Sequence, residues 1–537
     1  MSGLSRPALA LVPRHHPEGN LGAFGRAAAL ARPDATAVID ISGPAPLVLS
    51  YGALEDRLNQ AVAYMAGLGI GRGSRVGMGL PNSTGFLVTQ LALMRAGAVP
   101  VLINHRLPID TIRFMVGDAE MTDIIVDLDD VPALQALADM PGVKGFYSTG
   151  TVPPGWSAWA PLSFPGRSAA VARMGFDEQC FQAYTAGSTG VPKGIVLTHG
   201  GMLWGIEHSQ LYWPRHAGER GLVAAPMFHK NAMRGTIKPL MRVGGSFVIM
   251  RRFDPAGYAA ALADHEVTFC GGVPAMFAEM MKLGLLRAEK LAKLETLSMG
   301  SSTVPEELVA RLKQALPHVA IKESYGLTEG GGPLRAPLDG RHVPPGSVGV
   351  PAPEYELRLA DAVRQADGTV GALEIRSPYV CREYWNRPDL TAERLKDGWL
   401  KTGDVFRVDA EGFYYFVGRA DDMFVCGGEN IYPKEVEAVL VKHPEVADAI
   451  VVPLPHDTKG FAPAAVVARR PGSGAEPAAI QDFCAANGPS FAIPRAVIVL
   501  DALPLTPANK PDRAAARRLL EQRFGTLRSR AEGRAAG

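Results

Sequence analysis

The chain has 537 residues, and its 55 lysine and arginine residues nearly balance its 54 aspartate and glutamate residues, giving a formal net charge of +1 at pH 7. Nucleic acid and anionic membrane surfaces select an excess of cationic residues, so this balance argues against either as a broad partner. The hydrophobic fraction of 47% is typical of globular proteins, and at roughly 150 residues per domain the length suggests about two to four domains.

The cysteines and the N-terminus bear on the cellular compartment. The five cysteines are far apart and form no CxxC pair, which argues against a disulfide framework or a zinc site and favours a reducing compartment. The apolar stretch at residues 8–12 is shorter than a signal-peptide core, and no later run of about 18 apolar residues could span a membrane. We therefore expect a cytoplasmic protein with no membrane span.

Strands and helices alternate from residue 74 onward. Apolar runs at residues 75–80, 99–103 and 123–126 predict strands, and helical spacing at residues 83–96 and 108–119 predicts helices between them. This alternation indicates βαβ units in a mainly parallel sheet. Further along, residues 303–306 have the spacing of a capping box, and leucines at 308, 312 and 316 then predict a packing helix.

The pattern changes after about residue 340. Short alternating runs at residues 355–359, 372–376 and 412–417 predict a small β-rich subdomain. A compact α+β pattern follows from about residue 420, with helices expected at residues 433–442 and 480–486 and strands at residues 447–452 and 464–468. The predicted fold class is therefore α/β: a large N-terminal domain of βαβ-built sheets with helices, plus the β-rich subdomain, and a small C-terminal α+β domain.

A glycine-rich segment, Tyr-Thr-Ala-Gly-Ser-Thr-Gly-Val-Pro-Lys-Gly at residues 184–194, is the strongest local motif. Its glycines would let backbone N–H groups approach a polyphosphate, and hydroxyls and a lysine would add donors. A Walker A loop is excluded, because the lysine is followed by glycine and a strand rather than by serine or threonine and a helix. A flexible surface loop is the minority interpretation. The candidate phosphate-binding residues are Thr185, Gly187, Ser188, Thr189, Gly190 and Lys193.

Four more motifs follow in chain order. They are Glu-Ser-Tyr-Gly-Leu-Thr-Glu at 323–329, Gly-Trp-Leu-Lys-Thr-Gly-Asp at 398–404, Gly-Arg-Ala-Asp-Asp at 418–422 with Gly-Gly-Glu-Asn-Ile-Tyr-Pro at 427–433, and Leu-Pro-Leu-Thr-Pro-Ala-Asn-Lys at 503–510. With the glycine-rich segment, this series resembles the adenylate-forming superfamily, which includes acyl-CoA synthetases, luciferases and the adenylation domains of peptide synthetases. The resemblance runs from about residue 51 to residue 510, and it departs from the family pattern at Ala186, Ser301 and Asn509.

The resemblance implies roles for individual residues. It implies that Tyr325 lies against the adenine, Thr328 meets the α-phosphate, Glu329 holds Mg²⁺ and Asp404 accepts the ribose hydroxyl protons. It further implies that Arg419 contacts the nucleotide, Asp421 is the pivot of a domain hinge, Gly427 and Gly428 line the path of CoA, and Lys510 drives adenylation. The segment Ala-Pro-Met-Phe-His at 225–229 would place His229 beside the acyl carboxylate, and a satisfied loop or core histidine is an equally weighted alternative.

On this basis we expect an AMP-forming acid–CoA ligase that uses ATP, Mg²⁺ and coenzyme A and has no bound prosthetic group. The implied domains are residues 1–418, a hinge at 419–422 and a mobile domain at 423–537. The expected acid is an aromatic or medium-chain monocarboxylate, in a pocket drawn from His229, Asn231, Met233, Gly272, Ser301 and Ser302. Transfer of the acyl group to a carrier protein or amine and a non-catalytic nucleotide-binding homologue are the alternatives. The sequence leaves a homodimer open.

Overall fold

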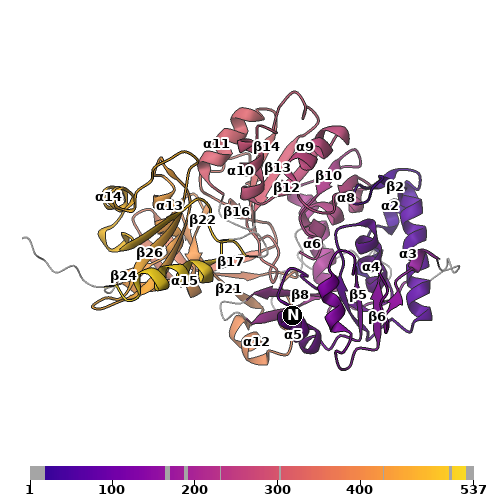
Figure 1. Ribbon diagram of the computed structural model, residues 1–537. Helices are drawn as coiled ribbons and strands as arrows, with labels where there is room; N and C mark the ends of the chain where they lie inside the picture. Colours follow the sequence, from indigo (N-terminus) through magenta and orange to yellow (C-terminus); the bar gives the residue numbers. More distant parts are fainter. Residues whose placement is uncertain are drawn as a thin grey trace, which may run out of the picture. The chain divides into compact units, whose positions relative to one another are not determined.

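The computed structural model describes residues 19–163, 170–186, 191–229, 232–300, 304–426, 429–506 and 511–527. The chain divides into two compact units (Figure 1). Unit 1 comprises Met1–Arg358 and Glu374–Thr402, and unit 2 comprises Leu359–Leu373 and Gly403–Gly537. Within the described residues, no helix is long and apolar enough to cross a membrane.

Unit 1 contains an eight-stranded sheet whose middle is parallel. Its order is β19 (Glu383–Tyr384), β9 (Pro192–Thr198), β8 (Gln179–Ala186), β4 (Val99–Leu102), β3 (Arg75–Gly79), β5 (Asp123–Val126), β6 (Gly145–Ser148) and β7 (Ser157–Ala158). The strands from β8 to β7 pair in parallel, whereas β8 and β9 form an antiparallel hairpin. Helices α4 (Thr84–Arg95) and α5 (Ile109–Asp118) connect the strands, as the alternating pattern predicted. Ser83 starts α4 by accepting a hydrogen bond from the Phe86 N–H.

A second sheet of unit 1 has seven strands, and six of them are parallel. Its order is β14 (Ala320–Ser324), β13 (Thr296–Gly300), β12 (Phe269–Gly272), β10 (Arg220–Val223), β11 (Ser246–Ile249), β1 (Thr36–Asp40) and the antiparallel β2 (Leu47–Ser50). The accompanying helices include α9 (Pro255–Asp264), α10 (Pro274–Lys282) and α11 (Glu306–Ala315), which lie near β12–β14 in Figure 1. Because the six strands run parallel, their carboxyl ends lie along one edge of this sheet.

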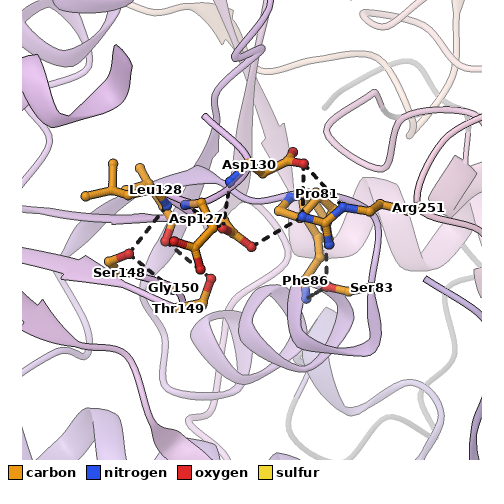
Figure 2. A network of polar contacts seen from close by, with 12 residues as sticks. Pro81, Ser83, Phe86, Asp127, Leu128, Asp130, Ser148, Thr149, Gly150 and Arg251 are labelled. Carbon is orange, nitrogen blue, oxygen red and sulfur yellow. Dashed lines mark hydrogen bonds and ion pairs between the residues drawn. The ribbon is translucent and has the colours of Figure 1, made fainter. Parts of the chain in front are cut away.

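A polar network joins the carboxyl ends of strands from the two sheets (Figure 2). Arg251 follows β11 and donates to Asp130 at 2.9 Å, with Asp127, directly after β5, at 3.7 Å. Asp127 also accepts the backbone N–H groups of Asp129 and Asp130 at 3.1 Å, which fixes the turn after β5. Because Arg251 and Asp130 are each at least partly exposed, we take the ion pair as a positioning contact rather than a large source of stability.

Unit 2 is built around its own sheet and core. The sheet has the order β24 (Glu429–Ile431), β23 (Phe424–Cys426), β26 (Gly460–Arg469) and β25 (Val446–His456), and β27 (Ala496–Leu500) pairs with β26. Helices α13 (Pro433–Leu440), α14 (Pro477–Asn487) and α15 (Arg513–Phe524) pack with it. A further sheet contains β17 (Glu356–Gln365), β18 (Gly368–Arg376), β21 (Trp399–Val408), β20 (Leu395–Lys396) and β22 (Tyr414–Arg419), and β17, β18 and β21 each include residues of both units.

Most predicted elements are confirmed within a few residues, but the predicted capping box is wrong. Helix α11 begins at Glu306, with Pro305 at the N-cap position and no side-chain cap. Proline pushes the residue before it out of helical backbone, so the helix cannot start at residue 304 as the capping box required. Glu306 and Glu307 in the first turn instead interact favourably with the helix dipole. All five cysteines are buried as free thiols.

Candidate functional site

The glycine-rich segment connects the two strands of the β8–β9 hairpin. The pairing places Thr185 directly opposite Lys193. A hydroxyl-bearing residue and a cationic residue therefore flank the connection as neighbours across the hairpin. Gly187, Ser188, Thr189 and Gly190 lie outside the described residues. The next glycine, Gly194, is required by packing: an added Cβ would lie 2.5 Å from the amide nitrogen of Gln182 and 3.1 Å from the Cβ of Trp385.

A network that the motifs did not predict braces this hairpin. The Tyr184 hydroxyl donates to Asp118 at 2.6 Å and accepts from Gln182 at 3.1 Å. Arg75 donates to Gln182 from β3, which lies beyond β4 in the sheet, and its guanidinium stacks 3.8 Å from the ring centroid of Trp385. Burial and the Asp118 carboxylate raise the pKa of Tyr184, so its hydroxyl remains a donor at neutral pH. Side-chain contacts therefore add to the backbone pairing that holds the start of the glycine-rich segment in place.

Several predicted site residues gather at the carboxyl edge of the seven-stranded sheet. Gly272 ends β12, and its register partner Met299 lies one residue before Gly300, which ends β13. Gly300 pairs with Ser324, so Tyr325 leaves β14 at the same level. In open α/β sheets this edge is where ligands bind. Ser301 and Ser302, which follow β13, lie outside the described residues.

Thr328 and Glu329 occupy a tight turn after Tyr325. Leu327 and Gly331 close the turn through two backbone hydrogen bonds of 2.9 and 3.0 Å. The Glu329 carbonyl accepts a bond of 2.7 Å from the Cys381 N–H, which anchors the tip. The Glu329 side chain is partly exposed. The described residues contain no group of three or more metal-binding side chains. A carboxylate oxygen is a ligand type that Mg²⁺ accepts alongside phosphates and water, so the chemistry of the Glu329 side chain is compatible with that ion.

The segment before His229 is held by an asparagine that sequence reasoning missed. Asn82 is 4% exposed and follows β3. Its amide nitrogen donates to the carbonyls of Ala225 at 2.9 Å and Met250 at 3.1 Å, and its oxygen accepts the Met227 N–H at 2.7 Å. The available signal was a polar residue at the carboxyl end of a buried strand. The bond to Ala225 spans 143 residues, which no local pattern reveals.

His229 and Met233 lie on either side of a short gap in the described residues. His229 ends the turn that begins at Pro226, to whose carbonyl its N–H donates at 2.9 Å, and its side chain is exposed. Met233 is buried at the start of the π-helical segment η4 (Met233–Ile237). Asn231 lies outside the described residues.

In unit 2, the structure brings Asp404, Arg419 and Asp421 together. Asp404 on β21 pairs with Arg419 on β22, and the Arg419 guanidinium lies 3.1 Å from the buried Asp404 carboxylate. The same guanidinium lies 3.7 Å from Asp421. The predicted ribose acceptor, nucleotide contact and hinge pivot therefore form one charged group within this unit.

Two predicted elements of unit 2, Gly427–Gly428 and Lys510, lie outside the described residues. On either side of the glycine pair, Cys426 and Glu429 pair as antiparallel neighbours. On either side of residues 507–510, Leu505 and Pro511 form an antiparallel bridge, and Asp512 caps α15. Arg513, in the first turn of α15, lies 2.7 Å from Glu437 of α13 and 3.7 Å from Asp422.

Known proteins resemble this chain in sequence and in fold. The sequence model of a family described as AMP-binding enzyme matches residues 25–385, and that of the AMP-binding enzyme C-terminal domain matches residues 435–510. Feruloyl-CoA synthase of Amycolatopsis sp is 33% identical over 89% of this chain and 94% of its own. Long-chain-fatty-acid–CoA ligase FadD13 of Mycobacterium tuberculosis is 30% identical over 86% and 91%. The crystal structure of ATP-bound MatB from Rhodopseudomonas palustris has a TM-score of 0.84 at 25% identity, covering 94% and 99%.

Proposed function

Because this chain belongs to the AMP-binding enzyme family, we propose that it is an ATP-dependent acid–CoA ligase. The observation that carries the proposal is the convergence of Gly272, Tyr325 and the His229 segment at one carboxyl edge of the seven-stranded sheet. The similarity to feruloyl-CoA synthase and a fatty-acid–CoA ligase, over more than four-fifths of each chain, supports CoA as the acceptor.

The first step joins the acid to AMP. One oxygen of the substrate carboxylate attacks the α-phosphorus of ATP, the bond to the β-phosphate oxygen breaks, and pyrophosphate leaves. In our proposal Thr185, Lys193 and the residues between them hold the departing phosphates, and Thr328 donates to the α-phosphate. Glu329 would hold Mg²⁺, which would neutralise charge on the phosphates. Lys510 would stabilise the negative charge that builds up between the carboxylate and the phosphate.

The second step passes the acyl group to CoA. The thiolate sulfur attacks the acyl carbon, the carbon–oxygen bond to AMP breaks, and AMP leaves with the electron pair. A lysine placed for the first step would obstruct the thiol, so we propose that residues 423–537 rotate about Asp421 in the hinge 419–422. Lys510 would then withdraw, and Gly427 and Gly428 would line the CoA path. Asp404, which belongs to residues 1–418, and Arg419, which belongs to the hinge, would hold the nucleotide.

The two half-reactions test this division of labour separately. Lys510→Ala should abolish pyrophosphate exchange but keep thioester formation from a supplied acyl-adenylate, and Lys442→Ala, which removes an exposed lysine of unit 2, should change neither. Equal loss in both half-reactions would contradict the proposed role of Lys510. Lys193→Ala should slow pyrophosphate exchange in a protein that melts normally, with Lys282→Ala as its control.

For the acid substrate, we propose a chemical class rather than a single compound. The sequence favours an aromatic or medium-chain monocarboxylate, and the names of the two relatives mention ferulate and long-chain fatty acids. A CoA-dependent AMP-release screen over aryl, short, medium and long acids, each with monocarboxylate and dicarboxylate members, tests this preference. Acyl-CoA among the products would separate CoA ligation from transfer to a carrier protein or amine. ATP binding without acid-dependent AMP release would favour a non-catalytic homologue.

A further inference from the structure

Two arginines of unit 1 lie in one cluster, and one of them directly follows Met233 of the proposed acyl pocket. Arg234 follows Met233 in η4 and is partly exposed. Arg335 ends the short strand β15 (Leu334–Arg335) and is 9% exposed. The two share Tyr212, the last residue of α6 (His199–Tyr212): Arg234 hydrogen-bonds its hydroxyl, and the Arg335 guanidinium lies 5.1 Å from its ring centroid.

The guanidinium of Arg234 contacts the segment that carries the Tyr-Gly-Leu-Thr-Glu motif. A Cβ added at Gly332 would lie 1.9 Å from its Nη2, and one added at Gly326 would lie 3.1 Å from its Nη1. Gly326 directly follows Tyr325, the proposed adenine contact. The arginine therefore reaches from the helix after His229 to the turn that holds Thr328 and Glu329, between the two segments that the proposed function assigns to acid and nucleotide.

In the part of the chain that the structure describes, no acidic side chain is among the groups that act electrostatically on Arg234 or Arg335. The groups that act electrostatically on Arg234 are the hydroxyls of Tyr379, Tyr212 and Tyr355. Arg335 likewise has Tyr212 as its electrostatic partner, and its buried Nε and Nη1 atoms have no hydrogen-bond partner among the described residues.

The neighbouring His208 does not carry a charge at neutral pH. Burial lowers the pKa of His208 to about 4, and the positive charges of Arg335 and Arg234 act in the same direction, so the ring is neutral at pH 7. The ring stacks on Trp204 at 4.3 Å and contacts the Pro353 carbonyl through Nε2. The cluster thus presents two guanidinium groups, neutral hydroxyls and a neutral imidazole.

Arg335 is 9% exposed, and buried charges in proteins are ordinarily paired, because an isolated ion loses its hydration without compensation. We propose that Arg234, supported by Arg335, binds a second carboxylate at the far end of the acid substrate. A guanidinium matches a carboxylate with two parallel N–H donors, and the surrounding tyrosine hydroxyls can donate to the same oxygens. This inference rests on the proposed function and replaces the monocarboxylate that the sequence favours with a dicarboxylate.

A purely structural arginine is the competing explanation. In that case Arg234 would hold the turn at residues 326–332, and its loss would impair every acid equally. A substrate-binding arginine instead discriminates between acids that differ only at the far end. Two matched pairs provide this comparison: adipate against hexanoate, and terephthalate against 4-methylbenzoate.

The experiment measures kcat/KM for CoA-dependent AMP release with these acids. For the wild type, we expect one of the two diacids to exceed its matched monoacid at least tenfold. Arg234→Gln should lower kcat/KM for that diacid about 100-fold, mainly through KM, and change its monoacid less than about threefold. Arg234→Lys, which keeps one charge, should fall between. Arg311→Gln, at an exposed arginine of α11, is the matched control. Equal preference in the wild type, or equal losses in Arg234→Gln, would overturn the proposal.

Calorimetric titration separates the binding site from the ligase activity. Without ATP or CoA, saturable binding of terephthalate or adipate to the wild type that is at least tenfold weaker in Arg234→Gln supports the site even if no acid releases AMP. Absence of AMP release with every acid would count against the proposed function alone. Absence of diacid binding, or binding that Arg234→Gln leaves unchanged, would count against the arginine site alone. Unchanged tryptophan fluorescence and ATP binding show that a variant is folded.

Discussion

Replacing Asn82 with alanine tests how the site segment before His229 is held in place. The side chain is 4% exposed and makes three hydrogen bonds, to the carbonyls of Ala225 and Met250 and from the Met227 N–H. Alanine removes all three and leaves main-chain groups without these partners. At about 1 kcal/mol for each hydrogen bond, the free energy of unfolding should fall by about 3 kcal/mol. Asn82→Asp keeps the acceptor but loses both donors, so it should cost at least about 2 kcal/mol.

Tryptophan fluorescence during urea unfolding is the suitable assay, because all six tryptophans belong to unit 1 and report its unfolding selectively. Asn487→Ala provides the control: it is the same change, but at an exposed residue of unit 2 with one bond to the Phe483 carbonyl, so the fluorescence transition should stay within about 0.5 kcal/mol. Asn82→Ala should also lower kcat/KM for the acid more than for ATP. A loss of stability below about 1 kcal/mol for Asn82→Ala would refute the reasoning.

Three more predictions concern Glu323, Gly332 and Arg513. Burial, with Glu306 adding repulsion, raises the pKa of Glu323 to about 7, so wild-type stability should fall as pH rises from about 4.5 to 7; Glu323→Gln should be the more stable protein at pH 8 in urea, and the difference should vanish below pH 4.5. Gly332→Ala should displace the neighbouring guanidinium and remove any preference for diacids in the AMP-release assay. Arg513→Ala should speed hydrogen exchange in α13 and α15, at a cost below the roughly 3–5 kcal/mol of a fully broken buried pair, because Lys434 keeps its own contact with Glu437.

The sequence predicts those parts of the fold whose causes are local. Strands β3, β4 and β5 and helices α4 and α5 follow from hydrophobic periodicity over about 50 residues, and Ser83 marks the start of α4. The capping box at residues 303–306 failed for a reason that is also local, because Pro305 restricts the backbone that the box needs. Local rules therefore predict helices and strands well, except where two rules act in opposite directions on the same residues.

The partners of individual side chains could not be predicted in this way. Asn82 bonds to residues 143 and 168 positions away, and Tyr184 reaches Asp118 across 66. Each contact depends on which strands become neighbours: β4 lies beside β8, although a long stretch of chain separates them. A sequence pattern shows that a strand is buried but not which strand covers it, so an asparagine at its end has no visible partner.

Arg234 shows the same difficulty for a charged residue, and the glycines explain how the fold accommodates it. In the sequence it is one cation among several near residues 234–252, and such residues are most often solvated. Gly332 leaves room for its guanidinium. In the run Gly330–Gly331–Gly332, an added Cβ would meet Ile375 at 2.2 Å, the Tyr355 hydroxyl at 2.4 Å and Arg234 at 1.9 Å respectively. Three adjacent glycines thus serve three different close approaches. The family motif ends at Glu329, and the glycines that follow it lie outside that motif. One of these glycines, Gly332, accommodates Arg234, the side chain that we propose selects the acid.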